Sequence, residues 1–223
     1  MLKTTPELAM PPEGLKLYQS PASPNSRRVR IFLAEKGLTV PLVDVDLSKA
    51  EQHSEAYRVI NPRRVVPTLV LEDGTAIGEV PAIMRYLEEA YPEKPLLGAT
   101  PKDSGLIAMW ERRVELEGFA AVMEGVRNKV AGLKGRAIAG PYDYEQIPAL
   151  VGRSVLRVKN FFADLNERLG QVPFVAGERY SAADITALVT ADFAKALELS
   201  VSPEDVALKR WYEVVSKRPS AAA

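Results

Sequence analysis

The 223-residue sequence predicts a mixed α/β domain followed by an all-α domain. Two observations carry this prediction. Strand and helix patterns alternate as far as Pro95, whereas beyond Pro101 only helical spacings of apolar residues remain. We expect the α/β domain to span residues 14–95 and the helical domain to span residues 102–219.

The first domain opens with Leu15–Leu33, in which a short apolar strand leads into a turn with two prolines and then into a helix. Asn25 or Ser26 can cap this helix, which should end at Gly37. The turn places Ser23 where free backbone N–H groups and the helix dipole favour an anion. The sequence therefore predicts a site for a thiolate or a carboxylate at this turn.

The rest of the first domain should complete a small sheet of mixed direction. Val40–Leu47 alternates as a second strand, parallel to the first because a helix connects them. Ser48–Tyr57 is polar and irregular. Strands Thr68–Leu71 and Thr75–Ile77 flank the hairpin signal Asp73-Gly74, and a helix follows from Glu79 to Tyr91. The order is βαβ followed by ββα.

The second domain shows helical patterns only. Asp103–Val130 is a long helix, and Ala131–Ile147 is a glycine-containing loop. Apolar residues spaced four and three apart form one stripe along Val151–Leu169. Ser181-Ala-Ala-Asp184 is a capping box that starts another helix, and Pro203–Lys217 is the last helix.

The composition excludes several classes of protein and site. Lys plus Arg equals Asp plus Glu at 29 each, so no excess charge attracts nucleic acid or an anionic membrane. There is no cysteine, so thiol chemistry requires a thiol that arrives on a ligand. The single histidine, His53, cannot build a histidine-based metal centre. The leader Met1–Gly14 lacks the apolar run of a signal peptide, and Pro11 and Pro12 suggest that it is loosely docked; we expect a cytoplasmic protein without a membrane span.

Four motifs in order carry a resemblance that covers nearly the whole chain. They are SPNSRRV (Ser23–Val29), NPRRVVPTL (Asn61–Leu69), GEVPAIMRYLEE (Gly78–Glu89) and SAADITAL (Ser181–Leu188). Together they resemble the glutathione S-transferase superfamily, in particular bacterial serine-type members similar to the theta, zeta and nu groups. The resemblance implies a thioredoxin-like first domain, a helical second domain, glutathione as co-substrate, no metal and a homodimer.

The resemblance implies a catalytic residue at the start of the first helix. Ser23 lies six residues before Val29, the separation found in serine-type members. Its hydroxyl would donate to the glutathione thiolate. Asn25, in the same turn, and Tyr18, near the end of the first strand, are the alternatives.

The resemblance also implies a glutathione site. Pro67 matches the family's cis proline, which would turn the backbone of Val66 toward an extended tripeptide. Glu79 matches the residue that binds the ammonium of the γ-glutamyl group, and the backbone N–H of Val80 would receive the carboxylate. The expected glutathione-binding residues are Ser23, Asn25, Gln52, His53, Val66, Pro67, Glu79 and Val80, with Gln52 and His53 near the glycine end.

The reaction expected from the resemblance is glutathione transfer to a small electrophilic, mostly apolar substrate. The acceptor pocket would draw on Tyr18, Met109, Arg112, Arg113, Leu116 and Phe119, together with the Ala131–Ile147 loop. Two alternatives remain open. One is another glutathione-dependent reaction, such as disulfide or peroxide reduction or isomerisation. The other is a non-catalytic interaction module with the same fold.

Overall fold

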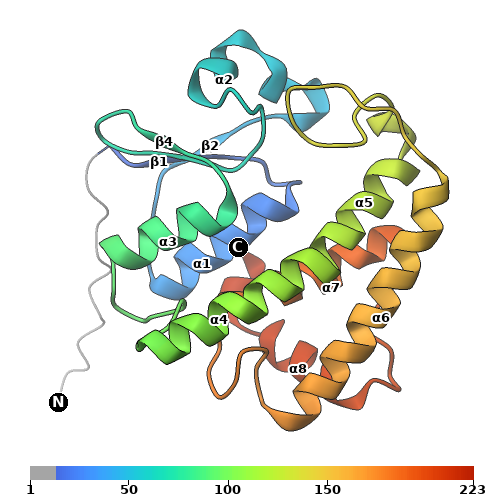
Figure 1. Cartoon of the computed structure of the whole chain (residues 1–223). Coiled ribbons are helices and arrows are strands. Elements are labelled where there is room, and N and C mark those ends of the chain that lie inside the picture. The colour runs from blue at the N-terminus through green and yellow to red at the C-terminus, as the bar shows by residue number, and fades with distance from the viewer. Residues whose placement is uncertain (1–13) are drawn as a thin grey trace. The chain divides into compact units, whose positions relative to one another are not determined.

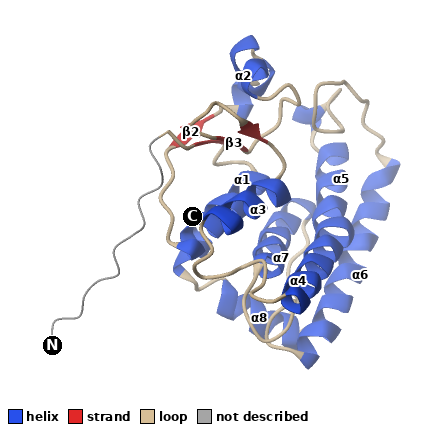
Figure 2. Cartoon of the chain, turned by 60° about the vertical axis from the view of Figure 1, so that its left-hand side comes forward, coloured by secondary structure: helices blue, strands red, loops and turns tan. Residues whose placement is uncertain are grey.

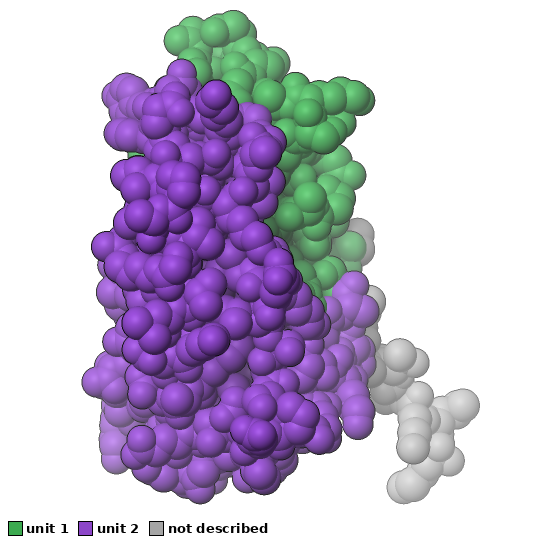
Figure 3. Space-filling model, turned by 90° about the vertical axis from the view of Figure 1, so that its right-hand side faces the viewer, with its two compact units in different colours: residues 1–94, 223 green, residues 95–222 purple. Residues whose placement is uncertain are grey.

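The structure is a computed structural model that describes residues 14–223. The expectations for the leader, including Pro11 and Pro12, therefore lie outside the described residues. Two compact units divide the chain, residues 14–94 and residues 95–222, and Figure 3 colours them separately. The first unit is α/β and the second is helical, as the sequence pattern predicts, and the first unit is thioredoxin-like, as the resemblance implies.

The first unit holds a mixed sheet with helices on both faces. Its elements are β1 (Lys16–Gln19), α1 (Pro24–Lys36), β2 (Leu42–Asp44), α2 (Glu55–Ile60), β3 (Thr68–Val70), β4 (Ala76–Ile77) and α3 (Val80–Ala90). The strand order is β2-β1-β3-β4. β1 pairs in parallel with β2 and antiparallel with β3, which pairs antiparallel with β4. Helices α1 and α3 lie side by side on one face of the sheet, and α2 lies on the other (Figures 1 and 2).

Alternation along β1 explains how the first unit forms its core. Leu15 and Leu17 are buried, while Lys16 between them is exposed. Apolar residues of α1 and α3, among them Phe32 and Leu87, are fully buried as well. A buried ammonium joins these two helices, since Lys36 Nζ contacts Glu88 Oε2 at 2.7 Å.

The end of α1 agrees with the sequence, and its start does not. Gly37 caps the C-terminus with a φ of 73°, in the left-handed region that glycine favours. At the N-terminus the capping residue is Ser23, and the expectation that Asn25 or Ser26 would cap the helix is wrong. Pro24 occupies the first helical position, where its missing N–H costs no hydrogen bond, and this moves the cap back to Ser23.

The segment expected to be irregular contains a helix. After two short 3-10 turns, α2 begins at Glu55 with Ser54 as its cap, because the Ser54 hydroxyl accepts from the N–H of Tyr57 at 3.2 Å. Only Tyr57 is buried within α2, so no apolar periodicity marks the helix in the sequence. The second strand is also shorter than expected, since β2 spans only Leu42–Asp44.

The helical unit contains α4 (Pro101–Arg113), a π-helical segment (Val114–Phe119), α5 (Ala120–Lys129), α6 (Ala149–Gln171), α7 (Ala182–Phe193) and α8 (Val206–Val215). Every residue from Ala182 to Ala191 is buried, so α7 forms the centre of this unit. The apolar stripe of α6 buries Val158, Phe162, Leu165 and Leu169, whereas its first members, Val151 and Val155, are only partly buried. The last helix is shorter than the expected Pro203–Lys217.

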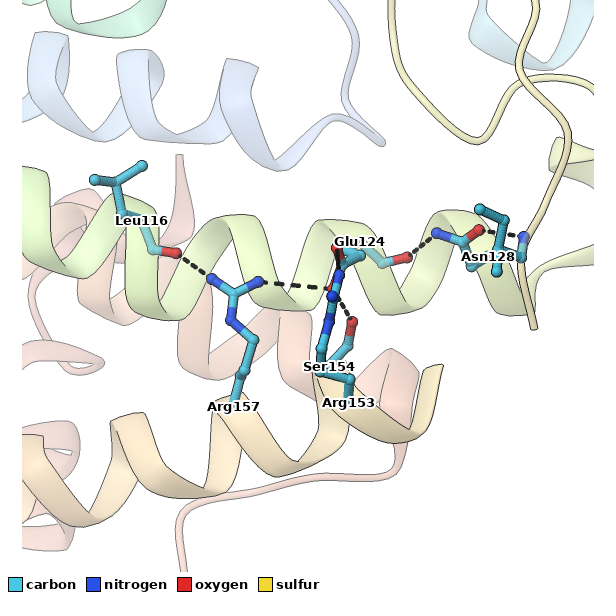
Figure 4. Close-up of polar contacts among 7 residues, drawn as sticks. Leu116, Glu124, Asn128, Arg153, Ser154 and Arg157 are labelled. Carbon is cyan, nitrogen blue, oxygen red and sulfur yellow. Dashed lines mark hydrogen bonds and ion pairs between the residues drawn. The ribbon is translucent and has the colours of Figure 1, made fainter. Parts of the chain in front are cut away.

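The expected helix from Asp103 to Val130 is interrupted by the π-helical segment. Gly118 in this segment lets α6 approach, because a Cβ there would lie 2.6 Å from the Phe161 ring. Arg157 of α6 donates to the carbonyl of Leu116 at 2.7 Å. Figure 4 shows this arginine reaching toward Glu124 as well, at 3.6 Å.

Glu124 fastens α5 to α6. Its carboxylate accepts from the hydroxyl of Ser154 and from the guanidinium of Arg153, both at 2.7 Å (Figure 4). Burial alone would raise the pKa of Glu124, but the hydrogen bonds from Ser154 and Arg153 lower it below its usual range. The carboxylate is therefore ionised, and both of its oxygens bond to side chains of α6.

The predicted capping box at Ser181 and Asp184 is confirmed. The Asp184 carboxylate accepts from the N–H of Ser181 at 3.0 Å and from the N–H of Val175 at 2.9 Å. It also accepts from the indole of Trp211 at 2.8 Å, which connects α7 to α8. The Asp184 carboxylate therefore joins α7 to α8 and to the loop that contains Val175.

Candidate active site

The turn between β1 and α1 brings a buried hydroxyl to a helix N-terminus. Ser23 is 7% exposed, and its oxygen accepts from the backbone N–H of Ser26 at 3.2 Å. Since that bond uses a lone pair of the hydroxyl, its proton remains to be donated. The start of α1 adds the positive end of the helix dipole. The site can therefore stabilise an anion beside Ser23.

Asn25 is the second residue of α1, two positions after Ser23. Its side-chain oxygen accepts from the guanidinium of Arg28 at 3.1 Å. Arg28 is only 1% exposed, so this contact is inside the protein. With the oxygen engaged, the amide N–H₂ of Asn25 is the group that can donate to a ligand.

Gln19 links the turn to the sheet. Its amide donates to Asp44 at the end of β2, and its oxygen accepts from Arg30 of α1. Arg30 also donates to the carbonyl of Ser20 at 3.3 Å. Burial lowers the pKa of Arg30, as does the charge of Arg27, while Asp44 opposes this. These contacts fix the loop that precedes Ser23.

Tyr18, the second alternative, takes part in packing. Its ring meets Tyr57 edge to face, with centroids 6.2 Å apart and planes at 64°. It also packs on a small core cluster of Val45, Tyr57 and Val66. The ring of Tyr18 is therefore in contact with apolar side chains, one of which belongs to Val66.

The Val66–Pro67 peptide bond is cis, as the resemblance implies. Val66 lies just before β3, which begins at Thr68. Within residues 14–223, neither the N–H nor the carbonyl of Val66 makes a hydrogen bond. Both groups can therefore pair with the backbone of an extended peptide ligand.

Glu79 stands at the start of α3 in an unusual conformation. Its φ is 62°, in the left-handed region, and its side chain makes no capping hydrogen bond. A non-glycine residue in this region is strained, and such strain concentrates at ligand sites. The exposed carboxylate is free of a capping role, and the N–H of Val80 begins the helix beside it.

Gln52 and His53 occupy a 3-10 turn, Glu51–His53, and both are partly buried. The Gln52 side-chain oxygen is buried without a hydrogen-bond partner. Arg64 is a site candidate that sequence reasoning missed: it has a φ of 56° and a buried Nε without a partner. Its signal in the sequence is the arginine pair that precedes Val65 and Val66.

The helical residues expected in the acceptor pocket differ in their surroundings. Phe119 is 5% exposed and packs on Phe193, with centroids 6.0 Å apart, so it belongs to the core of the helical unit. Met109 and Leu116 are 40% and 45% exposed. Arg112 pairs with Glu115 at 2.8 Å.

Arg113 lies over the ring of Trp110, 5.0 Å from its centroid. Both line an open depression of about 360 Å³ in the helical unit, together with Phe161 and Leu165. None of the other residues expected in the acceptor pocket lines this depression. The acceptor pocket therefore stays a prediction.

Residues 14–223 contain no group of three or more His, Cys, Asp or Glu side chains that could hold a metal ion. None of the helices in this range is both long and apolar enough to cross a membrane.

Comparison with known proteins identifies relatives of both units. Family models match residues 17–95 as "Glutathione S-transferase, N-terminal domain" and residues 141–219 as "Glutathione S-transferase, C-terminal domain". Glutathione S-transferase 2 of Saccharomyces cerevisiae is 33% identical over 222 residues, covering 92% of this chain and 86% of the relative. A glutathione S-transferase domain-containing protein of Marinobacter aquaeolei VT8 is 35% identical with a TM-score of 0.85, covering 92% of this chain and 98% of its own. The disulfide-bond oxidoreductase YfcG of Escherichia coli K12 is 28% identical, covering 92% of each chain.

Proposed function

The chain belongs to the glutathione S-transferase family and is a glutathione transferase, and we propose that the Ser23 hydroxyl activates bound glutathione for attack on a small, mostly apolar electrophile. Glutathione is its co-substrate. The observation that carries the proposal is the buried Ser23 hydroxyl, which accepts from the N–H of Ser26 and keeps its own proton to donate.

The energy that this site must supply is modest. A free thiol has a pKa near 8.5, and lowering it by about two units, so that the thiolate dominates at neutral pH, requires roughly 2.7 kcal/mol. A charge-assisted hydrogen bond from Ser23 and the N-terminus of α1 together supply energy of this order. The reaction forms a bond from the glutathione sulfur to the electrophile and displaces its leaving group.

We assign the remaining groups of glutathione to residues of the first unit by matching opposite charges and by following the order of its three residues. Glu79 binds the γ-glutamyl ammonium, and the N–H of Val80 receives the neighbouring carboxylate. The backbone of Val66 pairs with the cysteinyl residue. Gln52 and His53 lie toward the glycine end, where the partnerless Nε of Arg64 supplies a cation for the glycine carboxylate.

Binding of the two forms of glutathione tests the proposal. The purified protein is titrated calorimetrically with glutathione and separately with glutathione disulfide, while thiolate absorbance is followed in the reduced sample. We expect saturable binding of reduced glutathione with new thiolate absorbance at neutral pH. Because the chain has no cysteine, the absorbance can come only from the ligand. Absence of binding would leave the fold as an interaction module.

A second candidate function is glutathione-dependent disulfide reduction, which the similarity to the Escherichia coli disulfide-bond oxidoreductase favours. The lack of cysteine excludes a mixed disulfide with the protein itself, so the exchange would run between two glutathiones. Tighter binding of glutathione disulfide than of glutathione would support this candidate. Isomerisation remains a further use of the same thiolate.

The assembly and the location are also part of the proposal. We infer a cytoplasmic homodimer from the family to which the chain belongs. Sedimentation at micromolar concentration measures the assembly directly, and a monomer would contradict it.

A further inference from the structure

Two buried side chains donate to one backbone carbonyl of the first unit, and a third bonds to both of them. The hydroxyl of Tyr57 donates to the carbonyl of Val65 at 2.7 Å, and the amide of Asn61 donates to the same oxygen at 3.0 Å. The Asn61 amide also donates to the hydroxyl of Thr68 at 2.8 Å. Tyr57, Asn61 and Thr68 are 4%, 6% and 1% exposed.

The protons of this cluster can be assigned one by one. The Val65 oxygen has two lone pairs, and Tyr57 and Asn61 fill both. Thr68 therefore gives its proton to the Tyr57 oxygen, 3.0 Å away, rather than to Val65, which is 3.4 Å away. Burial raises the pKa of Tyr57, so its hydroxyl keeps its proton at neutral pH. Every side-chain proton donor of the three residues is then used, and each side-chain oxygen accepts at least one hydrogen bond, since the Asn61 oxygen accepts from the N–H of Arg63 at 2.9 Å.

The carbonyl held in this way controls a neighbouring donor. The Val65 carbonyl and the Val66 N–H belong to one planar peptide unit and point in opposite directions. Holding the oxygen in place therefore fixes the direction of the Val66 N–H. This N–H makes no hydrogen bond within residues 14–223.

We propose that Tyr57 is a positioning residue for glutathione, which aims the Val66 N–H at the ligand backbone through the Val65–Val66 peptide plane. This inference rests on the proposed function. Tyr57 itself does not touch glutathione. Its ring packs on Val66 and edge-on to Tyr18, so the hydroxyl can be removed while the packing stays.

Tyr57→Phe tests the inference, because it removes one hydroxyl and keeps the ring. We expect the Kd and KM for glutathione to rise about five-fold, as the loss of one neutral hydrogen bond predicts. The kcat at saturating glutathione should be unchanged. The pH midpoint of thiolate formation in the saturated complex should also be unchanged, because Ser23 is untouched.

Tyr212→Phe is the matched control in the helical unit. The Tyr212 hydroxyl contacts Asp192 at 2.5 Å and Lys195 at 3.0 Å, so this variant also loses hydroxyl contacts. Its glutathione affinity should equal that of the wild type. A general loss of stability would weaken binding in both variants, whereas a positioning role weakens it only in Tyr57→Phe.

Thr68→Val is the second variant, for the case in which Tyr57→Phe does not fold. It leaves the bond from Tyr57 to Val65 intact and removes the proton that Thr68 supplies to Tyr57, together with the oxygen that accepts from the Asn61 amide. Because the Val65 carbonyl keeps both of its donors but each is held less firmly, glutathione should bind about two-fold more weakly. The inference is overturned if folded Tyr57→Phe, or Thr68→Val in its place, binds glutathione as the wild type does. It is also overturned if kcat falls in that variant while the KM for glutathione stays unchanged. If the wild type itself does not bind glutathione, the proposed function fails first.

Discussion

The hydroxyl oxygen of Ser23 accepts a hydrogen bond from the backbone N–H of Ser26 at 3.2 Å, so the residue proposed to hold the glutathione sulfur also caps α1. Ser23→Ala should therefore lower both activity and stability. We expect kcat to fall about 100-fold, as for the loss of one donor to a reacting anion. The free energy of unfolding should fall by about 1 kcal/mol, as for a lost helix cap. Steady-state kinetics and urea unfolding measure the two effects.

Thr100→Ala is the control for the capping effect. Thr100 caps α4 by accepting from the N–H of Asp103 at 3.2 Å. Its loss should cost about 1 kcal/mol of stability, with turnover unchanged. Full turnover in Ser23→Ala would move the catalytic role to Asn25 or Tyr18.

Glu79→Gln should weaken glutathione binding with little change in the stability of the fold. The exposed carboxylate makes no capping hydrogen bond, so the substitution removes only the small attraction between an exposed charge and the helix dipole. Loss of a charge-assisted bond to the γ-glutamyl ammonium should raise the KM for glutathione roughly ten-fold. Kinetics at varied glutathione and a thermal unfolding curve measure the two quantities.

Glu89→Gln provides the comparison within α3. Glu89 is exposed and lies 3.7 Å from Arg85, in a surface ion pair of little energetic value. Its KM for glutathione should match the wild type. Equal KM values in both variants would remove Glu79 from the proposed site.

Replacement by alanine should change the stability of the protein in opposite directions at two glycines, Gly105 in α4 and Gly118 in the π-helical segment that follows it. A Cβ at Gly118 would lie 2.6 Å from the Phe161 ring, so Gly118→Ala should destabilise the protein by about 1–3 kcal/mol. A Cβ at Gly105 of α4 meets nothing within 4 Å. Gly105→Ala should therefore stabilise the protein by about 0.5–1 kcal/mol, through helix propensity. Urea unfolding compares them, and a neutral Gly118→Ala would mean that α6 can shift away from the π-helical segment.

Asp184 should make stability depend on pH. Burial raises the pKa of this carboxyl to about 6, although hydrogen bonds from Val175, Trp211 and Ser181 oppose the shift. The native state therefore holds the proton more tightly than the unfolded chain, whose carboxyl has a pKa near 4. This contribution to stability is complete below about pH 4 and is lost as the pH rises through about 6.

The variant Asp184→Asn isolates that contribution, because an amide does not titrate. The stability of the wild type relative to the variant should fall by on the order of 3 kcal/mol between about pH 4 and pH 7. Urea unfolding at several pH values measures the difference. A difference that does not change with pH would show that Asp184 is ionised throughout this range.

Local signals made most of the fold predictable from the sequence. Gly37 ends α1, Asp73 and Gly74 form the turn before β4, and Ser181 with Asp184 starts α7. In each case, one or two residues with special backbone or capping properties act on neighbours in the chain. The roles proposed for Ser23 and Glu79 likewise rest on their positions at helix starts, although the sequence placed the cap of α1 at Asn25 or Ser26 instead of Ser23.

Features that depend on distant residues could not be predicted. Helix α2 was missed because Tyr57 alone is buried in it, and one buried residue makes no periodic pattern. The cluster of Tyr57, Asn61 and Thr68 joins α2 and its C-terminal cap to β3, so no local sequence pattern marks it. The π-helical segment before Ala120 likewise contacts a distant helix, since α6 packs against it at Gly118.

Both tryptophans of the chain, Trp110 and Trp211, lie in the helical unit. Selectively excited tryptophan fluorescence therefore originates in that unit alone. Trp211 is 1% exposed and bonded to Asp184, so its emission should move to longer wavelength when α7 and α8 separate. Circular dichroism, in contrast, responds to the helices of both units. If the two signals change at the same urea concentration, the units unfold together as one cooperative structure, and separate midpoints would show that one unit stays folded after the other has unfolded.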